Sequence, residues 1–246
     1  MKAIITGMNG TVAPYIYNEL KRRDIEVYIW DRRKNSIDSE EAVFEYISSL
    51  QPDLFFHIAT GPVEWVEYIA KATKELKIKL IYTSSVSVFS ENGSGPYTAT
   101  SIPDAEDDYG RYKIEGENAV RSGNPHAIIA RLGWQIGSSA GSNNMMDFLF
   151  KAQKENGFIE ASSKWYPSCS FLEDTAEALV DAALDLPSGT YLLNSNTNYS
   201  FLEIVEHLRN LHGMQWDIRE TTTFFRDDRM YDNRAEIRKL DFTAEK

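Results

Sequence analysis

A glycine-rich turn near the start of the chain constrains the fold more than any other stretch. It joins a short apolar run, residues 2–5, to a helical stretch that ends at Arg23. The turn reads Gly7-x-x-Gly10-x-x-Ala13, with glycines for a tight turn and for close approach of a phosphate, and a small residue for helix–strand packing. The free N–H groups at the helix start attract phosphate. The stretch therefore predicts dinucleotide binding, with an ordinary glycine-rich turn as the alternative.

The next hundred residues alternate between runs that suit strands and runs that suit helices. Strands are predicted at Glu26–Trp30, Leu54–Ala59, Leu80–Thr83 and His126–Leu132, and helices at Ser39–Leu50, Val63–Leu76 and around Tyr109. The apolar run at residues 54–59 suits a strand buried on both faces of a parallel sheet, with His57 as a hydrogen-bonded core residue. The alternation predicts an α/β fold, a doubly wound parallel sheet of Rossmann type that binds ligands at the carboxyl ends of its strands.

Beyond the last of these strands the pattern loosens. Residues 138–144 read as a flexible connection. Helices are predicted at Met145–Glu155, Leu172–Leu186 and Phe201–Leu211, and a short strand at Thr190–Leu193. We expect an NAD(P)-binding Rossmann domain at residues 1–137 and a small C-terminal substrate-binding lobe at residues 138–246, interleaved with the first domain around residues 165–195.

The stretch around Tyr109 carries the strongest chemical signal. Residues four apart on a helix share a face, so Tyr109 and Lys113 stand one above the other in a helix capped by Asp107 or Asp108. An ammonium beside a phenol favours the phenolate, and we expect the pKa of Tyr109 to fall toward the range of a general acid or base. An incidental pair on an amphipathic helix is the alternative. Gly116, a poor helix former, predicts the close approach of another element.

Composition excludes several classes of function. The 246 residues carry a net charge of −11 and show no basic stripe, which argues against nucleic-acid binding. The single cysteine, Cys169, cannot form an internal disulfide and is expected to be a small buried side chain. No signal pattern and no apolar run of about 20 residues is present. We expect a cytoplasmic protein without a metal site and without membrane contact.

Several stretches together resemble the extended short-chain dehydrogenase/reductases, in the NAD-dependent epimerase/dehydratase superfamily. The matching stretches are the N-terminal Thr-Gly-x-x-Gly, Tyr-Thr-Ser-Ser-Val-Ser-Val-Phe89, Tyr-Gly-Arg-Tyr-Lys-Ile-Glu-Gly-Glu117 and Ala-Ile-Ile-Ala-Arg-Leu-Gly-Trp134. Over most of residues 1–210, the chain looks most like dTDP-4-dehydrorhamnose reductase and related nucleotide-sugar reductases. The resemblance implies an oxidoreductase that uses NADP or NAD to reduce a keto group of a nucleotide-linked sugar, and it is compatible with a homodimer.

The resemblance also assigns roles to residues. It implies that Tyr109 is the proton donor, that Lys113 lowers the Tyr109 pKa and holds the nicotinamide ribose, and that Ser85 orients the carbonyl. Ser84 is the rival of Ser85 for the last role. The residues placed along the cofactor, including those from the glycine turn, are Gly7, Gly10, Thr11, Val12, Asp31, Arg32, Ser36, Ile37, Ala59, Thr60 and Lys113. The residues expected at the substrate are Ser85, Val86, Trp134, Arg229 and Arg234.

Two signals conflict at the end of the second predicted strand. Asp31 lies about 20 residues after the glycines, a spacing that suits contact with free ribose hydroxyls. Arg32 and Arg33 follow at once, and a guanidinium there suits a 2′-phosphate, although Arg33 also fits a solvated turn. We expect both cofactors to bind, with a slight preference for NADP(H).

Departures from the reductase pattern bear on the substrate. Val86 stands where the rhamnose reductases carry Asp, and Pro62 stands where Asn is common. Dehydration is disfavoured, because Val86 and Ser87 cannot supply an acid. Two alternatives stay open: a nucleotide-sugar epimerase of the same fold, and a non-catalytic NAD(P)-binding regulator. The intact Ser-Tyr-Lys set argues against the regulator.

The charged tail from Arg226 to Lys246 is expected to be mobile or to cover the substrate. In an acidic chain an anionic nucleotide sugar needs a local cationic anchor, and Arg229 and Arg234 are the candidates for holding its diphosphate. The alternative is that the neighbouring aspartates simply pair with these arginines on a solvated surface.

Overall fold

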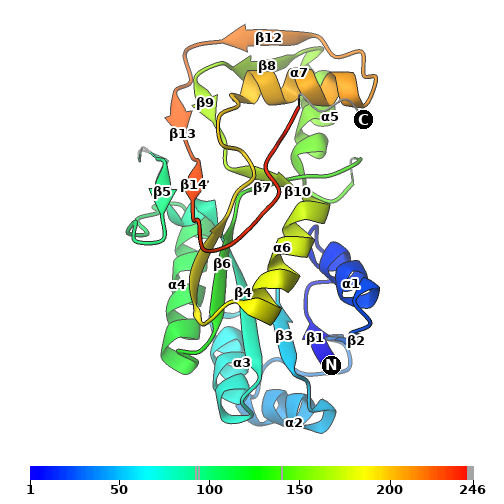
Figure 1. Cartoon of the computed structure of the whole chain (residues 1–246), viewed down its shortest axis with the longest axis vertical. Coiled ribbons are helices and arrows are strands. Elements are labelled where there is room, and N and C mark those ends of the chain that lie inside the picture. Colours follow the sequence, from blue (N-terminus) through cyan, green and yellow to red (C-terminus); the bar gives the residue numbers. More distant parts are fainter. Residues whose placement is uncertain (92, 94, 140, 243–246) are drawn as a thin grey trace.

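A six-stranded parallel sheet forms the centre of the computed structural model, which describes residues 1–91, 93, 95–139 and 141–242 (Figure 1). In spatial order its strands are β11 (Gly189–Leu193), β6 (Ile128–Leu132), β4 (Lys79–Ser85), β3 (Leu54–His57), β1 (Lys2–Ile5) and β2 (Glu26–Ile29). The chain runs outward from the β1–β3 boundary in both directions, which makes that boundary the switch point where doubly wound sheets bind ligands. The predicted fold class is confirmed.

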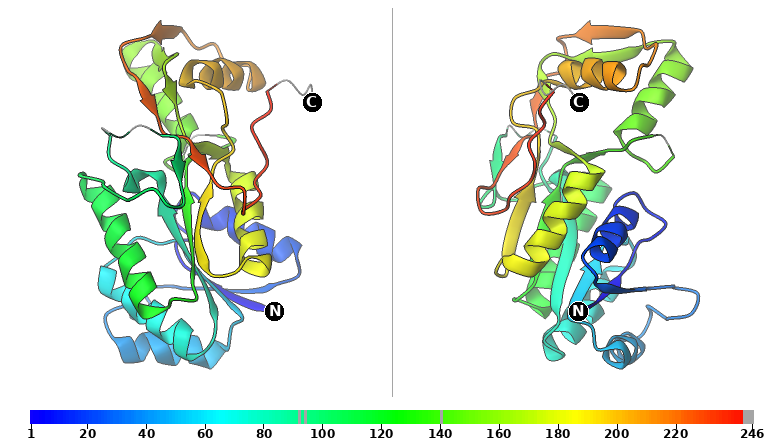
Figure 2. Two further views of the ribbon diagram at one scale, coloured as in Figure 1. Left: turned by 60° about the vertical axis from the view of Figure 1, so that its left-hand side comes forward. Right: turned by 45° about the vertical axis from the view of Figure 1, so that its right-hand side comes forward.

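Helices cover both faces of this sheet (Figures 1 and 2). One face carries α1 (Ala13–Arg22) and α6 (Leu172–Asp185), and the other carries α2 (Glu40–Leu50), α3 (Val63–Glu75) and α4 (Asp108–Gly123). The predicted caps form: the Ser39 hydroxyl accepts from the backbone N–H of Ala42, and the Asp107 carboxylate accepts from that of Gly110. These caps fix where α2 and α4 begin.

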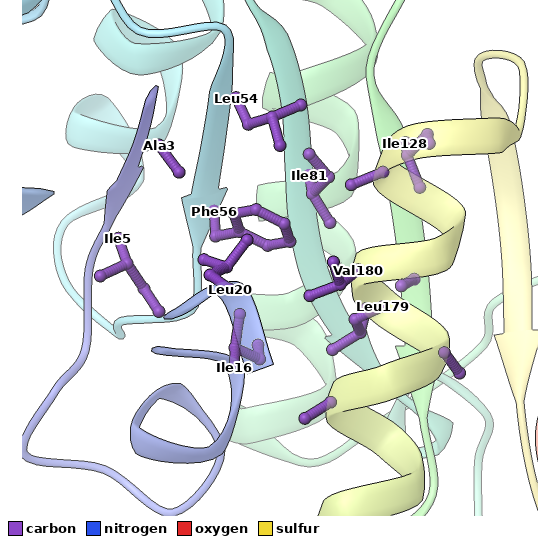
Figure 3. Close-up of a cluster of buried hydrophobic side chains, with 14 of the residues drawn as sticks. Ala3, Ile5, Ile16, Leu20, Leu54, Phe56, Ile81, Ile128, Leu179 and Val180 are labelled. Atoms are coloured by element: carbon purple, nitrogen blue, oxygen red, sulfur yellow. The ribbon is translucent and has the colours of Figure 1, made fainter. Parts of the chain in front are cut away.

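Alternation along the strands decides which side chain packs on which layer. Ile5, Phe56 and Ile81 point to one face, whereas Ile4 and Phe55 point to the other. On the first face, Figure 3 shows these strand residues against helical side chains, namely Ile16, Leu20, Leu179 and Val180. Because both faces of the strands are covered, the strand sequences read as continuous apolar runs.

A smaller lobe lies beyond the carboxyl edge of the sheet (Figure 2). It contains α5 (Met145–Asn156), α7 (Phe201–Leu211) and a separate apolar core that includes Ile136, Met145, Leu149, Cys169 and Phe201. Short parallel ladders complete it: β7 (Trp134–Ile136) with β10 (Cys169–Phe171), β8 (Ile159–Ser162) with β12 (Ile218–Thr221), and β9 (Trp165–Tyr166) with β13 (Arg226–Asp227).

The chain passes between the two parts more than once. After β10 it returns to the sheet as α6 and β11, and then leaves again for α7. We propose the division into a Rossmann domain of residues 1–137 and a lobe of residues 138–246, with α6 and β11 returning to the sheet from the second part.

The short ladders were not predicted from the sequence. Their strands are two to four residues long, too short to show an alternating pattern. One of these ladders joins β5 (Tyr97–Thr98) to β14 (Met230–Tyr231). The expectation of a mobile tail is therefore wrong for β13 and β14, which pair in register with other strands; residues 243–246 lie outside the described part. Within the described residues, no helix has the length and apolar character to span a membrane.

The close approach predicted at Gly116 is present between α4 and β4. A Cβ at this position would lie 2.1 Å from the Tyr82 hydroxyl oxygen and 2.8 Å from the ring carbon that bears it. The Tyr82 side chain is only 1% exposed, so it has little room to retreat. Glycine is therefore required here by packing, although it is a poor residue for a helix.

We expect Gly116→Ala to lower the free energy of unfolding by about 1–3 kcal/mol, the usual cost of overpacking, even though alanine favours a helix by about 1 kcal/mol. Urea unfolding measures the change. Asn118→Ala, exposed on the same helix, is the control and should change stability by less than about 0.5 kcal/mol. Adding Tyr82→Phe to Gly116→Ala should recover part of the loss; a more stable Gly116→Ala protein would contradict this account.

Candidate active site

A cavity of about 900 Å³ opens at the carboxyl edge of the sheet, beside the switch point. It is bounded by the turn after β1, the end of β2, the loop after β3, the end of β4, the first turns of α4 and the start of β7. The predicted residues that line it are Gly7, Gly10, Thr11, Val12, Asp31, Arg32, Ala59, Thr60, Ser85, Tyr109 and Lys113. The glycine turn and the Ser-Tyr-Lys set thus face one space.

The glycine turn is held against the loop that follows β3. Gly7 has a φ of +88°, and a Cβ there would lie 2.9 Å from the backbone nitrogen of Ala59. The buried Thr6 hydroxyl accepts from the backbone N–H groups of Ile58 and Ala59 at 3.0 and 3.1 Å. In the described chain no side chain caps α1, and its first turn carries no acidic residue. The N-terminus of α1 therefore keeps N–H groups and a positive dipole end available for an anion.

Lys113 is a buried residue that lines the cavity. Its ammonium donates to the Thr83 carbonyl at 2.9 Å and lies 5.3 Å from the ring centre of Tyr82 and 5.8 Å from that of Tyr109. Burial lowers the pKa of Lys113 to about 8, and the Glu117 carboxylate opposes this effect. The group therefore changes charge close to neutral pH.

Tyr109 is 48% exposed at the cavity, in the first turn of α4. Burial of the phenol raises its pKa above the ordinary value, and a hydrogen bond with Ser85 opposes the rise. The expected lowering of the Tyr109 pKa by Lys113 is wrong, because burial raises this pKa and the Lys113 ammonium donates to the Thr83 carbonyl. Tyr109 consequently keeps its proton at neutral pH.

The two neighbouring serines at the end of β4 have different surroundings. The Ser85 hydroxyl lines the cavity, accepts from the backbone N–H of Ser87 at 3.1 Å and also contacts Tyr109. The Ser84 side chain is 3% exposed and lies beside the Glu117 carboxylate. This geometry supports the preference for Ser85, which stays a prediction.

The charged residues after β2 form two separate sets of contacts. Arg33 binds both carboxylate oxygens of Asp31 at 3.0 Å, and this hydrogen bonding lowers the pKa of Asp31. Arg32 instead folds over the Trp65 ring at 4.6 Å and donates to the Thr60 carbonyl. All three charged residues line the cavity, and Arg33 also lies in an exposed turn, which agrees with the alternative given for it from the sequence.

His57 is a core residue, as expected. It is 1% exposed, its Nδ1 lies 3.1 Å from the Thr6 hydroxyl, and its ring packs edge-on against Trp65. Burial, helped by the charges of Lys113 and Arg32, lowers its pKa to about 3. The histidine is therefore neutral under ordinary conditions. No group of three or more metal-ligating side chains occurs among the residues that the structure describes.

Six predicted residues do not line the cavity. Ser36 accepts from the backbone N–H of Asp38, and Ile37 packs against the core beneath α2 and α3. Val86 packs in the small apolar cluster around Phe89, and Trp134 points into the lobe, where its ring stacks on Trp165 at 6.0 Å. The other two residues are Arg229 and Arg234.

The two tail arginines are occupied elsewhere. Arg229 binds Asp227 through two nitrogens and donates to the Thr197 carbonyl at 2.6 Å. Arg234 binds Asp232 in the same way and donates to the Thr190 carbonyl. Their assignment to the substrate diphosphate is not supported by this geometry, because pairing with the neighbouring aspartates satisfies both guanidinium groups.

Gln135 and Asn143 are among the cavity residues that the sequence reasoning missed. Gln135, the second residue of β7, is 7% exposed and donates to the Gly133 carbonyl at 2.9 Å. Asn143 belongs to a loop that the Thr11 hydroxyl contacts at the Ser142 carbonyl. The capping box of Asn144 and Asp147 marks the end of that loop and was a readable signal, whereas nothing in the sequence marks Gln135.

Comparison with known proteins identifies the family. A family model described as the RmlD substrate binding domain matches residues 62–222, more than half of the chain. The chain belongs to this family. The resemblance to the dTDP-4-dehydrorhamnose reductase type is thereby confirmed at the level of the family.

Individual relatives agree with this assignment. The spore coat polysaccharide biosynthesis protein SpsK of Bacillus subtilis is 22% identical over 90% of this chain and 83% of its own. A dTDP-4-dehydrorhamnose reductase of Aggregatibacter actinomycetemcomitans is 24% identical over 74% of this chain and 67% of its own. The dTDP-4-dehydrorhamnose reductase of Bacillus anthracis, solved with NADP, has a TM-score of 0.81 at 18% identity and covers 97% of this chain and 95% of its own.

The buried ammonium of Lys113 yields a test that needs no substrate. The pKa of Lys113, about 8 in the folded protein, lies below its ordinary value of 10.5, so the unfolded chain binds the proton more tightly. Folding therefore carries a cost of up to about 3 kcal/mol below pH 8, and this cost disappears as the pH rises from 8 to 10.5.

We expect Lys113→Met to raise the free energy of unfolding at neutral pH and to lose this advantage over that pH window. Urea unfolding at a series of pH values measures it. Lys151→Met, at an exposed position of α5, is the control and should show no such trend. If the free energy of unfolding of Lys113→Met changed with pH in the same way as that of the wild type, burial of the ammonium would not destabilise the fold.

Proposed function

We propose that this protein uses NADPH or NADH to reduce a keto group on a nucleotide-linked sugar. The observation that carries the proposal is the meeting of Ser85, Tyr109 and Lys113 with the glycine turn around one cavity. The family assignment supports the substrate class, and the NADP in the Bacillus anthracis reductase supports the cofactor. The nicotinamide, when bound, supplies the hydride.

In this proposal Tyr109 gives its proton to the oxygen of the keto group as that oxygen gains negative charge. A reductase needs an acid at this position, and burial of Tyr109 keeps the pKa raised and the proton in place. Ser85, which contacts the phenol, orients the carbonyl by donating a second hydrogen bond. The nearby ammonium of Lys113 then stabilises the phenolate that remains.

The substrate is proposed to enter between Tyr109 and the start of β7. Gly133 and Gln135 extend the cavity toward the lobe at that point. The exposed ring of Tyr109 forms the facing wall. With the sugar carbonyl near Ser85, the nucleotide part of the substrate would lie against the lobe. The sequence of the lobe lies largely within the region that the family model matches.

The decisive experiment follows nicotinamide absorbance while nucleotide-linked 4-keto sugars are offered one at a time. Stoichiometric oxidation of NADPH or NADH by one of them supports the reductase. The epimerase alternative predicts a tightly retained cofactor and isomerised sugar without net oxidation. Cofactor binding with no turnover of any sugar would favour the regulator.

We expect Tyr109→Phe to reduce turnover by a factor on the order of 10²–10⁴ while cofactor affinity stays close to wild type, because one general acid is lost. Tyr112→Phe is the matched control: its hydroxyl accepts from the backbone N–H of Gly61 at 3.0 Å and does not line the cavity. Turnover is measured with the sugar identified above, and affinity by calorimetry. Wild-type turnover in Tyr109→Phe would remove this residue from the mechanism.

The residues after β2 predict which cofactor binds better. We expect both to bind with a slight preference for NADP(H), because Arg32 and Arg33 adjoin the single carboxylate of Asp31. Arg32→Ala should weaken NADPH more than NADH, and Asp31→Ala should do the opposite. Isothermal titration with each cofactor measures both effects, with Arg33→Ala as the companion variant. Equal losses for the two cofactors in Arg32→Ala would show that Arg32 does not bind the 2′-phosphate.

A further inference from the structure

A buried ion pair joins α4 to the sheet directly below Lys113. The Glu117 and Arg131 side chains are 0% and 2% exposed, and Arg131 binds both carboxylate oxygens at 2.8 Å. Arg121 adds a third contact to the same carboxylate at 2.8 Å. The proposed mechanism makes no use of this pair.

The position of the pair ties it to the candidate site. Glu117 lies four residues after Lys113 and therefore on the same face of α4. In the register of β4 and β6, Arg131 lies opposite Ser84, and the next residue, Leu132, lies opposite Ser85. Glu117 is thus one helical turn from Lys113, and its partner Arg131 lies one residue before the position that pairs with Ser85.

Stability alone is a weak reason to keep such a pair. Taking two charges out of water offsets much of their attraction, and apolar side chains of similar size often serve a core equally well. Arg131 also lies over the Phe89 ring at 5.1 Å, in surroundings that would accept an apolar side chain. A buried carboxylate beside a buried ammonium, in contrast, has an effect that an apolar pair cannot supply.

We propose that Glu117 is a positioning residue that keeps Lys113 protonated, with Arg131 holding its carboxylate in place. The inference rests on the proposed function, in which the ammonium of Lys113 stabilises the Tyr109 phenolate. Arg131 and Arg121 keep Glu117 ionised, since hydrogen bonds from both arginines lower its pKa against the effect of burial. The charge of Glu117 in turn opposes the loss of the Lys113 proton.

The remaining surroundings of Lys113 do not provide this charge. The other titratable groups that face it from β3, β4 and α4 are His57, Tyr82, Tyr109 and Tyr112. The pKa of His57 is lowered, and those of Tyr82 and Tyr109 are raised, so these groups are neutral near pH 7. Within the described chain, Glu117 is the carboxylate that acts on Lys113.

The test compares two variants that break the same ion pair from opposite sides. Glu117→Gln keeps the size of the side chain and removes the negative charge, whereas Arg131→Met removes the positive charge. The titration of Lys113 is followed in the ligand-free protein by NMR of ¹³C-labelled lysine, with Lys113→Met to assign its signal. Val120→Ala, a buried apolar change on the same helix, controls for looser packing.

We expect the Lys113 midpoint to fall by on the order of one pH unit in Glu117→Gln and to stay at the wild-type value in Val120→Ala. In Arg131→Met, where Arg121 still binds the carboxylate, the midpoint should fall by less than in Glu117→Gln. An unchanged midpoint in Glu117→Gln, or the same fall in all three variants, would overturn the proposal. If the single variants do not fold, the double variant Glu117→Gln/Arg131→Met removes the whole pair. Its midpoint should also fall, because Glu117 acts on Lys113 directly, and an unchanged value there would overturn the proposal equally.

The same shift should appear in the reaction. The alkaline limb of kcat/KM should move to lower pH in Glu117→Gln and not in Val120→Ala, since this profile reports groups of the free enzyme. The NMR titration needs no substrate and remains readable if no nucleotide-linked sugar is reduced. Failure of the proposed function and failure of this inference are therefore distinguishable.

Discussion

The burial of one ammonium organises this site. Lys113 reaches from α4 to the Thr83 carbonyl, and this contact brings the helix against β4 where Ser85 and Tyr109 meet the cavity. Gly116 lets the same helix come close to Tyr82 one turn later. A buried charge without support would lose its proton, which is why the carboxylate of Glu117 one turn below matters. Packing and electrostatics thus act at successive turns of a single helix.

Burial in the fold changes the proton affinity of both titratable groups of the site. The raised pKa of Tyr109 and the lowered pKa of Lys113 both follow from burial, yet they act in opposite senses. The phenol holds its proton more firmly, and the ammonium releases its proton more readily. The proposed reduction, in which Tyr109 delivers a proton and then carries a negative charge, needs both groups protonated at the start. Protonation of Lys113 is the less secure of the two, because burial lowers its pKa, and the Glu117 carboxylate opposes this lowering.

Local patterns predicted much of this from the sequence. The glycine turn, the caps at Ser39 and Asp107, and the Tyr109–Lys113 spacing are short-range features, and the structure contains each of them. Properties that depend on three-dimensional burial were not readable. The direction of the Tyr109 pKa was wrong, because spacing along a helix does not reveal which carbonyl the lysine contacts. The two- to four-residue ladders of the lobe and the cavity position of Gln135 carry no periodic signal.

The tail arginines show how local pairing limits what a charge pattern implies. Arg229 and Arg234 each follow an aspartate by two residues, a spacing at which the guanidinium turns back onto the carboxylate. Asp31 and Arg33 repeat this spacing at the cavity, but there the arginine is 88% exposed at its side chain and can move away from its partner. Arg229 is 19% exposed and also holds the Thr197 carbonyl, so leaving its aspartate would break several contacts at once. The same sequence signal therefore accompanies an exposed ion pair at the cavity, Asp31–Arg33, and a half-buried structural pair in the tail, Asp227–Arg229, and the exposure of the arginine separates these two.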